Sequence, residues 1–191
     1  MSHIPELYFK THEAWREWLL SNHSQHKGVY LIFYKVGHDN DSMRWEEAVK
    51  VAICFGWIDS TVKSLGDGKR RQYFTPRNPK SVWSAVNKRY IEELLEADLM
   101  HESGLKTIAI AKDNGSWTSL DDVENGIIPE DLQEAFNQHP KAFKNYQSFA
   151  PSYRKSYLYW LNQAKREATR AKRISEIVQL CGDNIKSRGG Y

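Results

Sequence analysis

The stretch WIDSTVKSLGDGKRRQYFT, residues 57–75, contains the two β-like runs and the turn that decide the fold class. Its ends, residues 57–62 and 71–75, are rich in β-branched and aromatic residues. Between them, Gly66-Asp67-Gly68 is typical of a hairpin turn. Upstream, GVYLIFYK at residues 28–35 indicates one more strand of the same composition. We therefore expect a small antiparallel sheet of about three strands.

Helical periodicity accounts for most of the remaining chain. Apolar residues recur at helical spacing after three residues that can act as N-caps, namely Thr11, Ser42 and Ser81. The helix after Ser42 is expected to bury an apolar face that begins with Trp45. From His101 onward the pattern predicts only helices, several of them opened by a proline at a first-turn position, namely Pro129, Pro140 and Pro151.

These elements predict an α+β fold in which packed helices cover the small sheet, followed by a C-terminal helical bundle. We place an α+β core domain at residues 1–120 and a helical C-terminal region at residues 121–191, and expect the two to pack as one unit. The boundary lies in the loop from Trp117 to Ile128.

Composition and cysteine usage exclude several classes of protein. The chain has 191 residues, 40% of them hydrophobic and 27% charged, as in a globular protein with a sizeable core. Its start lacks the basic and apolar regions of a signal peptide, and no run approaches the ~18 apolar residues of a membrane span. Cys54 and Cys181 occur in no metal-binding or disulfide spacing. We expect a cytoplasmic protein with neither a membrane span nor a structural zinc.

Charge is distributed unevenly along the chain, although the net formal charge is only +3. Residues 63–89 carry eight bases against Asp67, and residues 150–191 carry nine bases against three acids. The segment between them, residues 90–149, holds twelve acids and four lysines. Two basic segments therefore flank an acidic one, of which the part from Glu92 to Glu134 is the plausible docking surface for a cationic peptide.

Three strings resemble the YdeI/OmpD-associated family across nearly the whole chain. They are CFGWIDS at residues 54–60, FTPRNPKSVWSAVN at residues 74–87, and AKR with TRAKRI at residues 164–174. The resemblance implies a small α+β core similar to YjbR and CyaY, and a link to bacterial tolerance of bacteriocins and cationic antimicrobial peptides. No settled enzymatic activity comes with it. Many relatives have a proline near Arg166-Glu167-Ala168, so we expect the last two helices to be more continuous here.

The segment from Lys69 to Trp83 interleaves arginines with aromatic rings. Arginine binds phosphate or carboxylate in bidentate fashion, and aromatic faces stack on flat groups. We predict a ligand-binding site for an anionic small molecule or protein partner, formed by Trp57, Asp59, Arg71, Arg77, Lys80, Trp83, Ser84 and Asn87. The alternatives are structural: a solvated edge strand protected by its bases, a hydrogen bond from Asn87 to a neighbouring loop, and an ion pair between Asp59 and an arginine.

The sequence leaves three hypotheses for function, and our leading one is a cytoplasmic accessory or stress-protection protein that binds an anion at this site. The second is nucleic-acid binding, with the hairpin as a wing and Arg166, Arg170 and Arg173 on phosphates. The third is a small-molecule enzyme that uses Asp59 as acid or base.

Catalytic, cofactor and metal motifs are absent from the sequence. It has no hydrolase, phosphate-loop, dinucleotide or zincin pattern, so we assign no catalytic residue, cofactor or metal. The spacing of His23 and His26 is only a weak metal signal, and Cys54 is interpreted as a buried apolar residue rather than a nucleophile. The sequence leaves the oligomeric state open.

Overall fold

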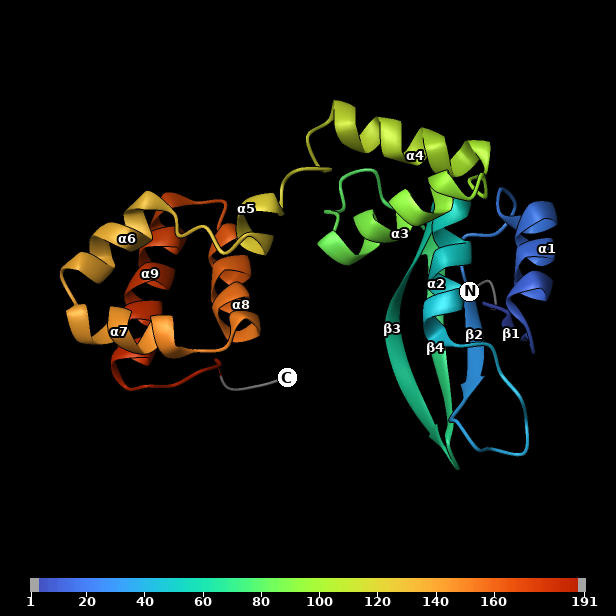
Figure 1. The fold of residues 1–191 in the computed structure, drawn as a ribbon, viewed down its shortest axis with the longest axis horizontal. Coiled ribbons are helices and arrows are strands. Elements are labelled where there is room, and N and C mark those ends of the chain that lie inside the picture. The colour runs from blue at the N-terminus through green and yellow to red at the C-terminus, as the bar shows by residue number, and fades with distance from the viewer. Residues whose placement is uncertain (1–3, 189–191) are drawn as a thin grey trace. The chain divides into compact units, whose positions relative to one another are not determined.

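A computed structural model describes residues 4–188, which divide into two compact units between Thr118 and Ser119 (Figure 1). The first unit combines a sheet with helices, and the described part of the second is helical. The predicted α+β class is therefore confirmed. None of the helices within residues 4–188 has the length and apolar character needed to cross a membrane.

The sheet of the first unit has four strands in the order β1-β2-β4-β3. Their bounds are β1 (Glu6–Tyr8), β2 (Val29–Tyr34), β3 (Trp57–Gly66) and β4 (Lys69–Pro76). Strands β2, β4 and β3 are antiparallel, as predicted, but β1 adds a parallel strand at the edge beside β2. The prediction of about three antiparallel strands missed β1 because three residues are too few to show a two-residue alternation.

The β3–β4 hairpin is confirmed where its turn was predicted. Asp67 and Gly68 have φ values of 47° and 70°, the left-handed pair that a type I′ turn needs. Beyond the turn, alternate residues of β4 point to opposite faces. Gln72 and Phe74 are buried on the face that the helices cover, whereas Arg71 and Tyr73 lie on the other face, which we call the open face.

Four helices belong to the first unit: α1 (His12–Asn22), α2 (Trp45–Cys54), α3 (Ala85–Glu96) and α4 (Glu102–Asp113). Thr11 caps α1 as predicted. Two predicted caps were wrong, because α2 begins after Arg44 and α3 after Ser84. The hydroxyl groups of Ser42 and Ser81 instead donate to the carbonyls of Met43 and Asn78 in the preceding loops.

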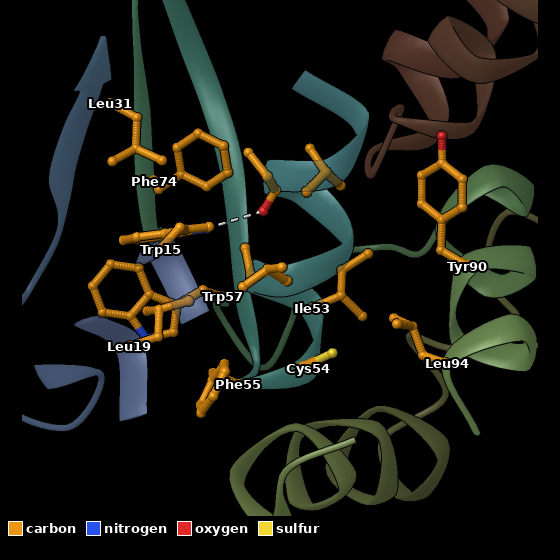
Figure 2. Close-up of a cluster of buried hydrophobic side chains, with 14 of the residues drawn as sticks. Trp15, Leu19, Leu31, Ile53, Cys54, Phe55, Trp57, Phe74, Tyr90 and Leu94 are labelled. Atoms are coloured by element: carbon orange, nitrogen blue, oxygen red, sulfur yellow. Dashed lines mark hydrogen bonds between the residues drawn. The ribbon is translucent and has the colours of Figure 1, made fainter. Parts of the chain in front are cut away.

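The core of the first unit is centred on Trp15 of α1, which is fully buried (Figure 2). Its indole nitrogen donates a 3.2 Å hydrogen bond to the carbonyl of Ala48 in α2. Its ring makes edge contacts with Trp57 and Phe74, at centroid distances of 6.4 and 5.8 Å. Cys54 is also buried, and burial raises the pKa of its thiol, consistent with an apolar role.

The second unit is built from α5 (Asp121–Glu124), α6 (Glu130–Asn137), α7 (Pro140–Ser148), α8 (Pro151–Asn162) and α9 (Glu167–Gly182). Pro140 and Pro151 open α7 and α8 as predicted, whereas the short α5 lies in what was predicted to be a loop. The last two helices were expected to be more continuous than in relatives, yet they are two separate helices in this chain. Residues 163–166 separate them, and this break lets Leu161 and Ile177 of successive helices share one core.

A close helix crossing in the first unit yields a stability prediction. A Cβ atom on Gly104 of α4 would lie 2.2 Å from the Cys54 carbonyl oxygen, so Gly104→Ala forces the backbones apart. We expect a loss of about 1 to 3 kcal/mol in the free energy of unfolding. Urea titration followed by tryptophan fluorescence measures it. The control Gly182→Ala, whose Cβ meets nothing within 4 Å, should not lose stability, and an equal loss in both variants would contradict the argument.

A second prediction concerns pH, through His101 at the start of α4. Its ring stacks on Phe55 at 4.9 Å, and burial, with a smaller effect of His23, lowers its pKa below the ordinary 6.5. Since the folded pKa is depressed, the neutral His101 side chain contributes to the free energy of unfolding. This contribution is complete above about pH 6.5 and is lost as the pH falls through the folded pKa.

Urea midpoints at about pH 7.5 and 5.5 measure this loss. The variant His101→Asn retains a capping side chain but does not titrate, so its midpoint should fall less between the two pH values than that of the wild type. Equal falls in the two proteins would show that His101 contributes nothing to the pH dependence.

Candidate functional site

The closest pairing among the predicted site residues is between Arg77 and Trp83. The guanidinium carbon of Arg77 lies 3.6 Å from the Trp83 ring centroid, and its Nη2 donates to the Val82 carbonyl. Both side chains are buried, and burial lowers the Arg77 pKa to about 10, while Asp59 opposes that shift. The pair therefore holds the loop between β4 and α3 against the core.

Ser84, Asn87 and Lys80 lie around the same loop. The Ser84 hydroxyl accepts a 3.3 Å hydrogen bond from the Asn87 backbone and so caps α3. The Lys80 backbone donates to the side chain of Asn78, and the Lys80 side chain is exposed. The Ser84 side chain thus starts a helix, and Asn87 contributes its backbone N–H to that cap.

Trp57, Asp59 and Arg71 lie elsewhere on the sheet. Trp57 is part of the core, and its indole donates to the His23 carbonyl at 3.2 Å. Arg71 pairs with Glu6 on the open face, and its guanidinium lies 4.3 Å from the Tyr30 ring centroid. The structure thus brings Arg77, Trp83 and the start of α3 together, but places Arg71 on a different face of the sheet from Asp59.

Asp59 connects the predicted set to a pocket that the prediction did not include. Its Oδ2 accepts hydrogen bonds from the indole nitrogen of Trp45, at 2.9 Å, and from the amide of Gln72. Trp45 was expected to join the apolar face of its helix, but it is 39% exposed. Asp59 therefore holds the Trp45 ring at the surface, where it lines the pocket described next.

We call this cavity the hairpin pocket, because it lies between the β3–β4 hairpin, the end of β2 and the start of α2. Its volume is about 490 Å³. It is lined by Phe33, Tyr34, Lys35, Val36, Met43, Arg44, Trp45, Val62, Ser64, Gly68, Lys69 and Arg70. Four of these residues are bases and three are aromatic, and the lining includes no carboxylate.

Strand register and turn geometry assemble the bases of the pocket. Phe33 and Tyr34 of β2 pair with Arg70 and Lys69 of β4, and the Arg70 guanidinium lies 5.4 Å from the Phe33 ring centroid. The Lys35 backbone donates to the Gly68 carbonyl at 2.8 Å. A Cβ on Gly68 would come within 2.8 Å of the Lys35 side chain, so glycine leaves room for that lysine.

The N-terminus of α2 adds to the positive character of the pocket. Arg44 is the N-cap residue and Trp45 the first helical residue, so the positive end of the helix dipole lies at this wall. The Glu47 carboxylate accepts a 2.6 Å hydrogen bond from the Arg44 backbone. An anion with a flat ring therefore meets both cations and aromatic faces here.

The site predicted from the sequence did not include Lys35, Arg44 or Trp45, although the sequence carries a signal for them. They flank the polar segment from Gly37 to Ser42, between a strand and an amphipathic helix. Because this segment forms a loop between the strand and the helix, the bases that flank it lie together near the edge of the sheet. Among the described residues there is no cluster of three histidine, cysteine or acidic side chains suited to a metal ion.

The structural role of the Arg77 side chain can be tested by substitution. Arg77→Ala removes a buried cation–π contact and leaves the Val82 carbonyl without its donor, so we expect a loss of about 2 to 4 kcal/mol in the free energy of unfolding. Denaturant titration checks it. Arg89→Ala, which removes an arginine that is 63% exposed, should cost under about 1 kcal/mol. Similar small losses in both variants would contradict a structural role for Arg77.

Comparison with known proteins gives matches to two family models. A model described as a domain of unknown function, DUF8412, matches residues 7–107. A model described as "Bacteriocin-protection, YdeI or OmpD-Associated" matches residues 125–184. The two matches fall in the first and second units respectively.

One curated relative was also found, the "Uncharacterized protein YdeI" of Bacillus subtilis (strain 168). It is 30% identical over 106 residues, which are 53% of this chain and 45% of the relative. The match thus covers less than half the length of that relative. No solved structure gives a significant match to the chain.

Proposed function

We propose that this chain, which belongs to the DUF8412 family and to the bacteriocin-protection, YdeI or OmpD-associated family, binds a small anion with a flat ring in the hairpin pocket. The observation that carries the proposal is the lining of that pocket, where four bases and three aromatic residues meet without a carboxylate. The hairpin pocket is not the site predicted from the sequence, because none of the eight predicted residues lines it.

Charge is the first support for the proposal. Lys35, Arg44, Lys69 and Arg70 come from three separate segments of the chain and converge on one cavity. Like charges that gather in a concave site repel one another, and an anion relieves that repulsion. The Asp59 carboxylate does not line the pocket, and its charge also acts on Arg77.

Shape and aromatic content are the second support. A volume of about 490 Å³ falls within the range of small-molecule pockets. Trp45 is 39% exposed and offers a flat face, and Asp59 limits the rotation of its ring. An ordered ring loses little conformational entropy when a ligand stacks on it. Aromatic carboxylates and phosphorylated ring compounds combine the charge and the flat group that this lining suits.

The family description suggests how such binding relates to biology. We propose a cytoplasmic accessory role in tolerance of bacteriocins that acts indirectly, through an anionic metabolite or an anionic partner. Direct capture of a cationic peptide in this pocket is disfavoured, because its four bases would repel the peptide. Catalysis by Asp59 is a weaker candidate, because the hydrogen bonds it accepts give it a positioning role.

Two neighbouring arginines on β4 give a matched test. Arg70 lines the hairpin pocket and Arg71 lies on the open face, so the variants Arg70→Ala and Arg71→Ala remove the same charge from opposite sides of one strand. Ring-containing phosphates and carboxylates would be screened by thermal shift at about 50 mM salt, where ion pairing is strong. Isothermal titration would then give the Kd of each hit.

We expect Arg70→Ala and Arg44→Ala to weaken binding about tenfold or more, since each removes a charged hydrogen bond. Arg71→Ala should leave the Kd within about twofold, because the open face does not line the pocket. The proposal fails if no compound shifts the melting temperature of the wild type. It also fails if Arg71→Ala weakens binding as much as Arg70→Ala does.

A further inference from the structure

We infer that the open face of the sheet is a second binding site, for single-stranded nucleic acid, which adjoins the hairpin pocket at Tyr34. The feature that points to it is a group of four tyrosines, Tyr8, Tyr30, Tyr34 and Tyr73, which we call the tyrosine face. None of them belongs to the hydrophobic core cluster of the first unit. The face also carries Arg71 between the rings.

Strand register places these residues together although they are distant in sequence. Tyr30 of β2 is directly opposite Tyr73 of β4, and Ile32 is opposite both Arg71 of β4 and Tyr8 of β1. Tyr34 follows on the same side of β2, because alternate residues of a strand share a face. The rings therefore run from β4 across β2 to β1.

The rings are held in position before any ligand arrives. The Tyr30 and Tyr73 ring centroids are 5.1 Å apart, and those of Tyr8 and Tyr34 are 5.5 Å apart. Tyr73 lies across Gly28, where a Cβ atom would come within 2.1 Å of its hydroxyl oxygen. Ordered aromatic side chains bind at a lower entropic cost than mobile ones.

The combination of rings and bases indicates which ligand binds to the tyrosine face. Every nucleobase has a flat face that stacks on an aromatic ring, and Arg71 and the neighbouring Lys63 of β3 supply cations for phosphates. Glu6 is the acid that the strands place beside Arg71, and it already pairs with that arginine. An acidic peptide would use the bases but would leave the four rings without a role.

The nucleic acid must be single-stranded, because stacking on a flat sheet requires bases that are not already stacked in a duplex. Neighbouring strands are about 4.8 Å apart, so two ring pairs on three strands accommodate about two to three nucleotides. With roughly two phosphate contacts, from Arg71 and Lys63, the slope of log K against log salt should be about −1.4.

Fluorescence anisotropy with a labelled oligouridylate of about 12 nucleotides tests the inference on the full chain, at about 50 mM salt. We expect saturable binding that weakens at least about fivefold in Arg71→Gln, which loses a phosphate contact, and in Tyr30→Leu, which loses a ring of the tyrosine face and the contact that positions Arg71. Tyr8→Ala serves as a further ring variant if Tyr30→Leu does not fold, because Tyr8 is 44% exposed at the sheet edge. Thermal melting confirms that each variant is folded.

Arg70→Ala is the matched control, because it removes the adjacent base from the opposite face and should leave the nucleic-acid Kd unchanged. The same variant is expected to weaken ligand binding in the hairpin pocket, so failure of one proposal does not imply failure of the other. The inference is overturned if binding is absent up to about 100 μM protein, a range that covers weak non-specific association. Equal loss in Arg70→Ala, equally tight binding of a matched duplex, or equally effective displacement by polyglutamate would also overturn it.

Discussion

The buried indole of Trp15 is the contact on which the first unit depends. Its hydrogen bond to the Ala48 carbonyl joins α1 to α2, and its ring contacts with Trp57 and Phe74 join both helices to the sheet. An indole N–H buried without an acceptor would cost about 1 to 3 kcal/mol, so this hydrogen bond fixes the position of α2 on the sheet. In that position, Arg44 and Trp45 lie beside the end of the hairpin.

Strand β4 serves two surfaces because its side chains alternate. Arg70 contributes to the hairpin pocket, while the adjacent Arg71 contributes to the tyrosine face. The two guanidinium groups each lie over an aromatic ring, Phe33 on one side and Tyr30 on the other. A run of bases that reads as one patch in sequence is therefore two separate sites in space, and each has its own aromatic partner.

Much of the fold could be predicted from local patterns. The hairpin turn at Asp67 and Gly68, the cap at Thr11 and the helix starts at Pro140 and Pro151 depend on nearby backbone geometry, and all were confirmed. The elements that escaped prediction are short, namely β1 and α5, which have too few residues to show a period. The separation of α8 from α9 escaped because it depends on a core that both helices share.

The sequence by itself determined the alternation of β4, the composition of the basic segment and the starts of α1, α7 and α8, since these follow from residue type and spacing. Only the tertiary structure decided which charges meet. Arg44 and Arg70 are far apart in the chain, and the packing of α2 on the sheet brings them to one pocket. Trp45 of α2 faces that pocket because the Asp59 carboxylate, from strand β3, accepts its indole hydrogen. Such contacts depend on the register between strands, which no local pattern encodes.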